Sequence, residues 1–531
     1  MTTVPRPDNW LIVLGATVAT LAVAAAPTPA GLSVAGQRAL ATATFAAVLW
    51  ITGALPLAVT ALTVPVWLVV LGVYPTLAEA LTGFADPVVF LFLSTFVLAA
   101  ALQKHGLDRR VALRLLARVG TTPRRVVLGV MVATAGLSML ISNTATVALM
   151  APIAVGVVRQ IDAAADRSVE NLHAATLLGV AYAGSIGGIG TLIGTPPNAI
   201  VVAQLADAGH EVSFADWLVV GLPTVAVTLP LAWFLLVRLY PPEPVDVSGA
   251  RAGARRAAAS AGSLDRAGRR VAVVAVAVAA LWLLGGLEFL FAGYLPPEWV
   301  TTLFGGEGAW IFSEGVAARG EAGYQGLLYF VVVGLAAVPV LFLAGGVEWE
   351  DVEGIDWGTL LLFGGGLTLA DALSDTGATG WVAGRVVAAF GDAPLAILLA
   401  AIVALTVVLS ELASNTATAA VLAPVLIEVG RGFGTVGSAV VGGGSAGAGG
   451  GFAGLGGGVE AAVLLPLASA VAASYGFALP VATPPNAIVF GTGEVTRGQM
   501  LRAGSVLDAV FVVVTTAVLL VLAVTVLPAV V

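Results

Sequence analysis

Apolar runs of about 20 residues recur along nearly the whole of this 531-residue chain. As a helix, a run of this length crosses the ~30 Å hydrocarbon core of a bilayer, whereas the strands of a membrane barrel alternate apolar and polar residues. Hydrophobic residues make up 59% of the chain and charged residues only 10%, which is not the composition of soluble domains. The sequence therefore predicts an all-α polytopic membrane protein embedded in a lipid bilayer.

Two polar phrases each occur twice, in the same order. Ser-Asn-Thr-Ala-Thr occupies residues 142–146 and 414–418, which are 272 positions apart, and Thr-Pro-Pro-Asn-Ala-Ile occupies residues 195–200 and 483–488, which are 288 apart. A Pro-Pro pair is hard to place inside a continuous helix, because proline removes a backbone donor and clashes with the preceding turn. Broken segments at equivalent places in two half-chains are the best sequence indication of a transporter's binding site.

The whole chain, including the segments that carry these phrases, fits eleven spans and two hairpins. Before the first hairpin, Lys104 and four arginines up to Arg118 interleave with leucine and valine, which predicts an amphipathic helix at the interface. Hairpins that enter and leave on one side are predicted over residues 124–157 and 395–428, and broken spans over 173–203 and 462–490. The other nine spans are predicted over residues 10–26, 34–53, 57–75, 87–102, 217–240, 271–293, 325–345, 358–380 and 503–530.

The basic residues predict the orientation. With the N-terminus in the cytoplasm, 19 of the 23 lysines and arginines lie inside, and those left outside are Arg38, Arg319, Arg385 and Arg431. The arginine-rich loop 241–270 is then cytoplasmic and the C-terminus lies outside. Without the first helix, each half has five crossings, so the halves face opposite ways as an inverted repeat. The first hairpin opens from the cytoplasm and the second from outside.

We call Ser142, Asn143 and Thr144 the first tip, and Ser414, Asn415 and Thr416 the second tip. At mid-membrane, such a tip must be buried in protein or line a watery cavity, because lipid cannot satisfy its backbone groups. Its side chains can cap the second half-helix, whose free N–H groups attract an anion. Its side-chain oxygens and the loose carbonyls of the first half-helix can hold a hard cation such as sodium.

The segments that carry these phrases contain no lysine or arginine to neutralise a divalent anion. A bound cation can supply that charge, which gives a physical reason for coupling the two ions. The alternative is that each phrase only joins helices through small residues and hydrogen bonds. The duplication, with a Thr-Pro-Pro-Asn segment in each half, favours a binding site.

Other functions find little support. The chain has no cysteine, its three histidines are scattered singly, and it has no basic domain of the nucleic-acid-binding type. A membrane-embedded enzyme is the rival from another class, but Ser142 and Ser414 lack a convincing base, so we expect no catalytic residues. An anion channel is a second rival, which saturable counterflow would distinguish from a carrier.

The motifs resemble those of the divalent anion/sodium symporter (DASS) family over nearly the whole chain. The resemblance rests on both tips and on residues 194–198 (Gly-Thr-Pro-Pro-Asn), 482–486 (Ala-Thr-Pro-Pro-Asn) and 362–366 (Leu-Phe-Gly-Gly-Gly). It implies a homodimer in the cell membrane that transports a di- or tricarboxylate, such as succinate or citrate, or sulfate. It also implies an elevator motion of a transport domain against a scaffold domain. Most members couple transport to sodium, and some are exchangers, so a sodium-independent exchanger is the alternative function.

The resemblance also assigns residues. One sodium ion is expected near Ser138, Ser142, Asn143 and Gly194, and a second near Ser410, Ala413, Asn415 and Ala482. The anion is expected at both tips and at Thr483, Pro484, Thr195 and Pro196. No organic cofactor is expected. Glu411 is either a structural carboxylate hydrogen-bonded to the second tip or a titratable coupling group.

In domain terms, the resemblance implies two scaffold parts and two transport parts. The scaffold parts are residues 1–120 and 271–392, the transport parts are residues 121–240 and 393–531, and residues 241–270 are the cytoplasmic linker. Residues 442–458 are almost all glycine, alanine and serine, and we expect a flexible insertion there, present in the second half only. Together with the long loop 296–324, this insertion departs from the family pattern without touching the motifs.

Overall fold

The computed structural model describes most of the chain. The described residues are 9–116, 122–249, 262–306, 324–390, 393–434 and 459–527, with the isolated residues 252, 256, 259 and 311. The predicted glycine-rich insertion 442–458 lies outside them, as do parts of the arginine-rich loop and of the loop 296–324. Among the described residues every named element is helical, which confirms the all-α prediction.

The described residues of the first half, up to the arginine-rich loop, form twelve helical elements. They are α1 (Asn9–Ala25), α2 (Val34–Thr52), α3 (Leu57–Val70), α4 (Leu77–Ala80), the 3-10 turn η1 (Thr82–Ala85), α5 (Pro87–Lys104), α6 (Leu107–Leu116), α7 (Pro123–Ser138), α8 (Asn143–Asp162), α9 (Glu170–Ile189), α10 (Pro196–Asp207) and α11 (Phe214–Leu239).

The second half presents the same order. Its described helices are α13 (Arg266–Gly285), α14 (Glu288–Phe291), α15 (Pro297–Phe304), α16 (Phe330–Leu343), α17 (Trp349–Glu353), α18 (Trp357–Asp375), α19 (Ala378–Phe390), α20 (Leu395–Leu412), α21 (Asn415–Phe433), α23 (Ala461–Ala472), α24 (Pro484–Gly491) and α25 (Arg497–Thr525). The starts of α7 and α20, and of α8 and α21, are 272 positions apart, and those of α10 and α24 are 288 apart. The spacing of the motifs is thus also the spacing of the helices that carry them.

Two glycines show how a shared local rule sets the helix ends. Gly106 follows α5 and Gly377 follows α18, with φ angles of 60° and 72°. This left-handed conformation is the usual end of a helix and suits glycine, because a Cβ is disfavoured there. It explains why the predicted span 358–380 is wrong at its end: α18 stops at Asp375, and α19 starts at Ala378.

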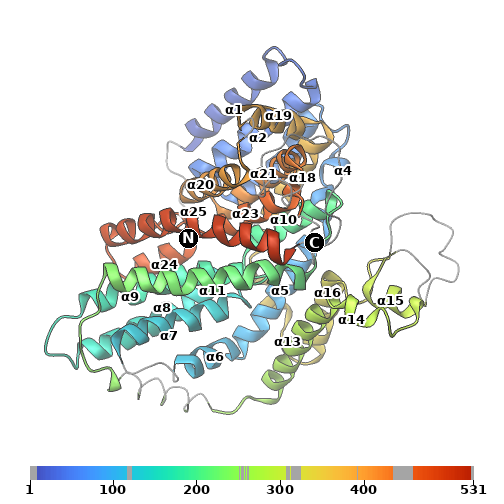
Figure 1. Cartoon of the computed structure of the whole chain (residues 1–531). Coiled ribbons are helices and arrows are strands. Elements are labelled where there is room, and N and C mark those ends of the chain that lie inside the picture. Colours follow the sequence, from blue (N-terminus) through green and yellow to red (C-terminus); the bar gives the residue numbers. More distant parts are fainter. Residues whose placement is uncertain are drawn as a thin grey trace.

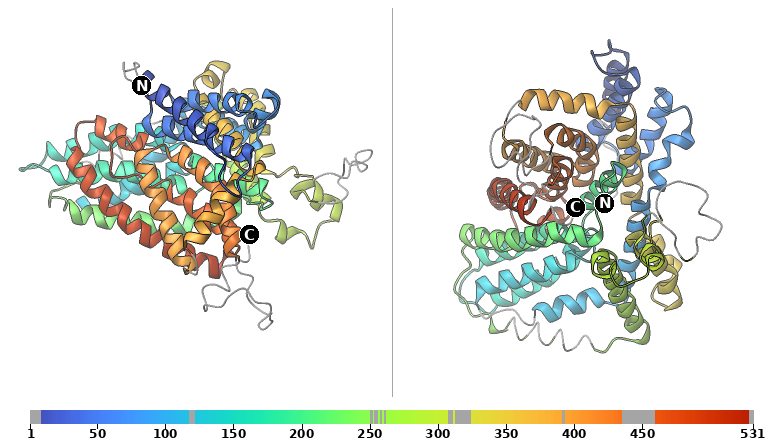
Figure 2. Two further views of the ribbon diagram at one scale, coloured as in Figure 1. Left: turned by 90° about the horizontal axis from the view of Figure 1, so that it is seen from above. Right: turned by 45° about the vertical axis from the view of Figure 1, so that its right-hand side comes forward.

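The helices pack as two groups (Figures 1 and 2). In one group α1 packs against α2, α2 against α3, and α3 against α18. Beside these helices, α5, α13 and α16 pack against one another. In the other group α9 packs against α7, α8 and α11, which lie side by side in Figure 1, and α25 packs against α11, α20 and α23. Contacts of α18 with α21 and of α11 with α13 join the groups.

Several predicted spans are confirmed as helices, but some boundaries are wrong. The predicted spans 57–75 and 325–345 form shorter helices, α3 and α16, and the predicted span 271–293 ends earlier, where α13 stops. In the described part of the chain nine helices are long and apolar enough to cross a membrane, and five further apolar helices have 10–17 residues. The nine include α8, α20 and α21, so by length alone each arm of these predicted hairpins could cross, apart from α7.

Both predicted hairpins and both predicted broken spans are interrupted where the motifs stand. Residues 139–142 separate α7 from α8, and residues 413–414 separate α20 from α21. In the broken spans, α10 and α24 begin at Pro196 and Pro484, the first proline of each Pro-Pro pair. Proline is tolerated at the first position of a helix because the N–H it lacks has no partner there.

Candidate functional site

The first tip is held together by Ser138, the last residue of α7. The hydroxyl of Ser138 donates to the backbone oxygen of Gly184 on α9 at 2.6 Å and lies 2.6 Å from the side-chain amide of Asn143. Ser138 is completely buried. The tip is therefore anchored to the middle of α9.

Oxygen atoms surround one end of the Asn143 amide. Ser138 Oγ, Gly184 O and Gly194 O lie 2.6, 3.0 and 3.2 Å from it, and when the amide nitrogen faces them it donates to all three. When the amide oxygen faces them instead, it lies within 3.2 Å of three other oxygens, which makes a cluster of four neutral oxygens. Converging neutral oxygens are the ligand set of a hard cation. The sequence predicted Ser138, Asn143 and Gly194 for such a set, and the structure brings these three together.

A second asparagine shapes the loop between α9 and α10. Asn198 is completely buried, and its side-chain nitrogen donates to Gly188 O at 3.0 Å and to Thr191 O at 2.8 Å. The hydroxyl of Thr191 donates to Met139 O at 2.5 Å, which ties this loop to the turn between α7 and α8. The loop thus presents the Gly194 carbonyl to Asn143.

The second tip repeats this arrangement. Ser410 Oγ donates to Ala473 O at 2.7 Å and lies 2.6 Å from the amide oxygen of Asn415. Asn486 is completely buried and donates to Gly476 O at 2.7 Å and to Leu479 O at 3.0 Å. The bonds of both asparagines have their equivalents in the first half at the offsets of the motifs, and the serine bonds to Gly184 and Ala473 match at an offset of 289.

Helices of the two halves of the chain pack against each other near the tips. The helix that follows each tip packs against the Pro-Pro helix of the other half: α8 contacts α24, and α21 contacts α10. The hydrogen bonds of each tip lie within its own half, and the helices that follow the tips join the two halves. That the tips face each other near the membrane centre remains a prediction.

Glu411 makes a contact that the first half lacks. Its two carboxylate oxygens accept backbone N–H bonds from Ala478 at 2.6 Å and Leu479 at 3.0 Å, in the loop between α23 and α24. The carboxyl group of Asp508 on α25 interacts with Glu411, and one Asp508 oxygen is buried without a hydrogen-bond partner. Glu411 thus braces the neighbouring loop, not its own tip as the structural alternative supposed.

The other tip residues have separate surroundings. Ser142 caps α8 by accepting the Ala145 N–H at 3.3 Å, so its hydroxyl serves the helix end instead of the oxygen cluster. Ser414 occupies the equivalent N-cap without a side-chain cap bond. Thr144 is exposed, whereas Thr416 is 8% exposed.

The predicted residues of the Pro-Pro segments differ between the halves. Thr195 makes no cap bond, whereas the hydroxyl of Thr483 accepts the Asn486 N–H at 3.3 Å. Pro196 is half-buried and Pro484 is exposed. Two alanines are the remaining predicted sodium ligands. Ala413 is the C-cap of α20, and Ala482 is buried next to Thr483. Their roles, like those of all the predicted site residues, remain predictions.

The sequence reasoning missed several residues that build the site. Gly184 and Ala473 supply the carbonyls that hold Ser138 and Ser410. Asn198 and Asn486 belong to the duplicated phrase, so their position in the repeat was a usable signal. Asp508 carried another signal, because a carboxylate within an apolar span is rare and marks a functional or structural polar contact.

A cluster of charged side chains lies at the far end of α8. Glu494, in the loop between α24 and α25, accepts two hydrogen bonds from Arg159, at 2.7 and 2.9 Å, and lies 2.8 Å from His173 Nδ1. Burial opposes the charge of Glu494, but the bonds from Arg159 and His173 outweigh it and lower the pKa of Glu494. This contact joins α8 to the second half of the chain.

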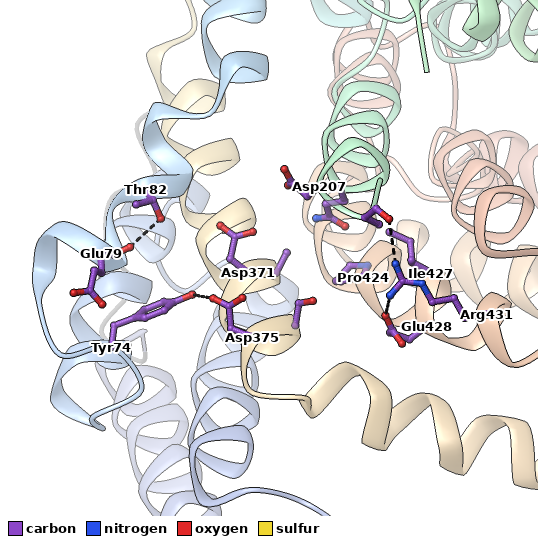
Figure 3. Close-up of a pocket in the computed structure, with 14 residues that line it drawn as sticks. Tyr74, Glu79, Thr82, Asp207, Asp371, Asp375, Pro424, Ile427, Glu428 and Arg431 are labelled. Carbon is purple, nitrogen blue, oxygen red and sulfur yellow. Dashed lines mark hydrogen bonds and ion pairs between the residues drawn. The ribbon is translucent and has the colours of Figure 1, made fainter. Parts of the chain in front are cut away.

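The described cavity lies elsewhere. It has a volume of about 520 Å³ and is lined by residues of the α3–α4 connection, α4, η1, α10, α18 and α21 (Figure 3). It includes none of the predicted sodium or anion ligands, and its lining is acidic. We therefore treat it separately from the tips.

The comparisons with known proteins agree with this architecture. The family described as the sodium:sulfate symporter transmembrane region matches residues 7–443 and 452–527. An uncharacterized transporter of Haemophilus influenzae is 34% identical, over 90% of this chain and 89% of its own. The sodium-dependent dicarboxylate transporter SdcS of Staphylococcus saprophyticus is 33% identical, over 92% of this chain and 86% of its own. Its Staphylococcus aureus counterpart is 32% identical, over 90% and 84%.

A solved structure also aligns with the chain. The YdaH transporter of Alcanivorax borkumensis aligns over 97% of this chain and 96% of its own with 15% identity and a TM-score of 0.47. The protein is a multi-pass membrane transporter, and not an enzyme. It belongs to the sodium:sulfate symporter family, which is the divalent anion/sodium symporter family that the motifs predicted.

Proposed function

We propose that this protein carries a divalent anion across the cell membrane together with sodium ions. The relatives named as sodium-dependent dicarboxylate transporters favour a dicarboxylate such as succinate over citrate or sulfate. The observation that carries the proposal is the duplicated Ser-Asn pair, in which Ser138 and Ser410 hold Asn143 and Asn415 in matching positions.

The first tip has the chemistry of a sodium site. Its oxygens are neutral hydroxyl, amide and carbonyl groups, and the Asn143 amide can offer either its nitrogen or its oxygen to them. In our proposal the nitrogen occupies the place of the ion when the site is empty, and the amide turns its oxygen inward when sodium binds. With the oxygen inward, the amide nitrogen faces hydrogen-bond donors at its other end, so the turn costs those bonds and sodium coordination offsets the loss.

The anion then binds between the tips. Each tip begins a long helix, α8 or α21, whose first N–H groups and positive dipole end favour negative charge. The tips and the Pro-Pro segments carry no basic side chain, so the sodium ions supply the remaining positive charge. This arrangement makes anion binding depend on sodium, and we assign the anion to Thr483, Pro484, Thr195 and Pro196 as well as to the tips.

We propose an elevator motion for the same reasons. In this proposal α7–α11 and α20–α25 move as a transport domain, and α1–α6 with α13–α19 form the scaffold. The packing of helices between the halves supports the first part, because α8 with α24 and α21 with α10 form one interlocked unit. We also propose that the chain forms a homodimer through its scaffold.

The orientation can be tested on the natural chain, because it has no cysteine. We place the N-terminus and the linker 241–270 in the cytoplasm, and the loop after α14 and the C-terminus outside. A cysteine at Tyr294, which is 89% exposed, should react with an impermeant thiol reagent added to intact cells. A cysteine at the exposed Ala259 should react only after lysis, and the reverse pattern contradicts the orientation.

Uptake of labelled succinate, citrate and sulfate into proteoliposomes tests the function. We expect an inward sodium gradient to stimulate uptake of one of these anions strongly, with potassium as the control cation. Counterflow without any sodium effect would instead identify an exchanger. Uptake of none of the three anions under either gradient would contradict the proposal.

A further inference from the structure

The cavity of about 520 Å³ lies between the two groups of helices. Figure 3 shows Glu79, Asp371 and Asp375 on one wall, with Tyr74 beside them, and Asp207 and Glu428 across the gap. Arg431 is the one basic side chain in this lining. Five carboxylates therefore face one guanidinium, and the lining disfavours a divalent anion.

The single arginine is already engaged. Arg431 pairs with Glu428 three residues away on α21 and donates to Ala208 O at 3.1 Å. On the opposite wall Tyr74 donates its hydroxyl to Asp375 at 2.9 Å. Among the described residues, Asp207 and Asp371 have neither a cationic nor a hydrogen-bonded partner, and the charge of Asp207 acts on Asp371. The cavity therefore has on each wall a carboxylate, Asp207 or Asp371, that no cationic side chain neutralises.

An independent observation comes from Gln204 on α10. Gln204 lines the cavity but is only 4% exposed, and its side-chain oxygen has no hydrogen-bond partner. Its side-chain nitrogen donates to Ala420 O at 3.3 Å, which fixes the amide with its oxygen unsatisfied. A buried acceptor without a donor indicates a missing partner, either a cation or a water molecule that a cation orients.

We propose that this cavity binds a hydrated divalent cation of the magnesium type. In the described part of the chain no three acidic or histidine side chains lie close enough to ligate a bare metal ion. Magnesium keeps several of its waters and is commonly held by one or two carboxylates. At ~30 Å³ for each water, six waters occupy about 180 Å³, so a hydrated ion fits this cavity.

The bound ion would connect the two walls. Its waters donate to Asp207 and Gln204 on α10 and to Asp371 on α18, so it neutralises the repulsion between these helices. Binding itself does not depend on the proposed function. Its consequence does: if α10 moves against α18 during transport, the ion slows that step, and in the proposed orientation it acts from outside.

Thermal unfolding of the purified full-length protein tests the site without any transport assay. With magnesium chloride added to 10 mM at constant ionic strength, we expect a saturable rise in the unfolding temperature, and calcium should act similarly. Asp371→Asn and Asp207→Asn should each raise the magnesium concentration for half of this rise by about ten-fold or more. Glu353→Gln, an exposed carboxylate on α17 outside the cavity, is the control and should leave it unchanged.

Three outcomes overturn the proposal: an equal rise with potassium chloride at matched ionic strength, an unchanged magnesium response in Asp371→Asn, or no magnesium heat in calorimetry of the wild type. If the aspartate variants do not fold, Gln204→Met replaces them, since it removes the acceptor oxygen at similar volume. A failure of sodium-coupled uptake leaves these measurements intact, so the cation site and the transport function are tested separately.

Discussion

The two tips share a hydrogen-bond plan but differ in what surrounds it. In the first half, four residues separate α7 from α8 and Ser142 caps α8, whereas in the second half two residues separate α20 from α21 and Ser414 makes no cap bond. Near the Pro-Pro segments the contrast is larger: Ile193 is 8% exposed, but its counterpart Val481 is 85% exposed. At this position the first half is enclosed by protein and the second is exposed, whereas at the tips Thr144 is exposed and Thr416 is buried.

The polar contacts behind the tips differ as well. Met139 and Val225 occupy the positions that Glu411 and Asp508 hold in the second half, at offsets of 272 and 283. The second offset is supported by Gly221 and Gly504, each of which lies directly against the loop after α9 or α23. An apolar pair in one half is therefore a carboxyl pair in the other. We infer that the loop of the second half, which is exposed at Val481, needs Glu411 to hold it, whereas packing holds the first.

The largest expected effect comes from converting Glu411 to its counterpart. Glu411→Met leaves the amides of Ala478 and Leu479 unpaired and should lower the stability by roughly 2–6 kcal/mol, at about 1–3 kcal/mol for each buried donor. Adding Asp508→Val should recover part of the loss, because it removes the carboxyl left without its partner. Denaturation of both single variants and the double variant measures the coupling.

The matched control lies in the first half. Met139→Leu conserves volume and polarity there, and should cost less than about 1.5 kcal/mol. If Glu411→Met is as stable as wild type, or if the double variant shows no coupling, the carboxyl pair does not hold the loop.

The second prediction compares two equivalent glycines, Gly188 in the first half and Gly476 in the second. A Cβ on Gly188 would meet the Asn143 side chain, whereas a Cβ on Gly476 meets Ser410 O only at 3.3 Å. Overpacking costs about 1–3 kcal/mol, so Gly188→Ala should weaken sodium affinity by roughly five-fold to more than a hundred-fold. Gly476→Ala should weaken it by less than about five-fold. Sodium titration of anion binding measures both, and equal losses would remove this distinction between the tips.

The sequence predicted the duplicated part of the molecule well. The breaks at the tips and the Pro-Pro helix starts follow from residues whose local chemistry fixes their conformation. That Ser138 lies near Asn143 was implied by the family resemblance. The Gly184 and Ala473 carbonyls could not be predicted, because any residue supplies a carbonyl and only the packing of α9 and α23 selects it. The acidic cavity also arises only in space, since its carboxylates come from segments up to about 350 residues apart.

The third prediction concerns the asparagines themselves. If Asn415 shares its amide between sodium and the anion, Asn415→Ala should weaken both affinities by roughly five-fold to more than a hundred-fold, since losing a buried polar partner costs about 1–3 kcal/mol. Because binding coupling is reciprocal, raising sodium should partly restore anion affinity. Asn143→Ala is the companion variant. Lower thermal stability with unchanged affinities for both ions would contradict the shared-ligand role.

The smallest effect is expected at the far ends of the tip helices. Arg159 on α8 and Arg431 on α21 are 272 positions apart, and each reaches the loop after the Pro-Pro helix of the other half. Arg159 binds the Glu494 carboxylate in that loop, whereas Arg431 reaches its loop through the Ala208 backbone oxygen, so of these two bonds between the halves only the first involves a carboxylate.

The sign of the pH dependence of this first bond follows from Glu494. The bonds from Arg159 and His173 lower the pKa of Glu494 below its ordinary value, against the effect of burial. The folded protein therefore holds the charged form more strongly than the unfolded chain. The resulting stability is fully present above the ordinary glutamate pKa of about 4.3 and is lost as the pH falls through the lowered pKa.

Glu494→Gln should thus lower the unfolding temperature by a few degrees at pH 6 and by less at pH 3.5. Glu428→Gln, at the Arg431 end, is the matched control, and its difference from wild type should vary less between these pH values. If the Glu494→Gln difference is the same at both, the carboxylate does not hold α8 to the second half through its charge.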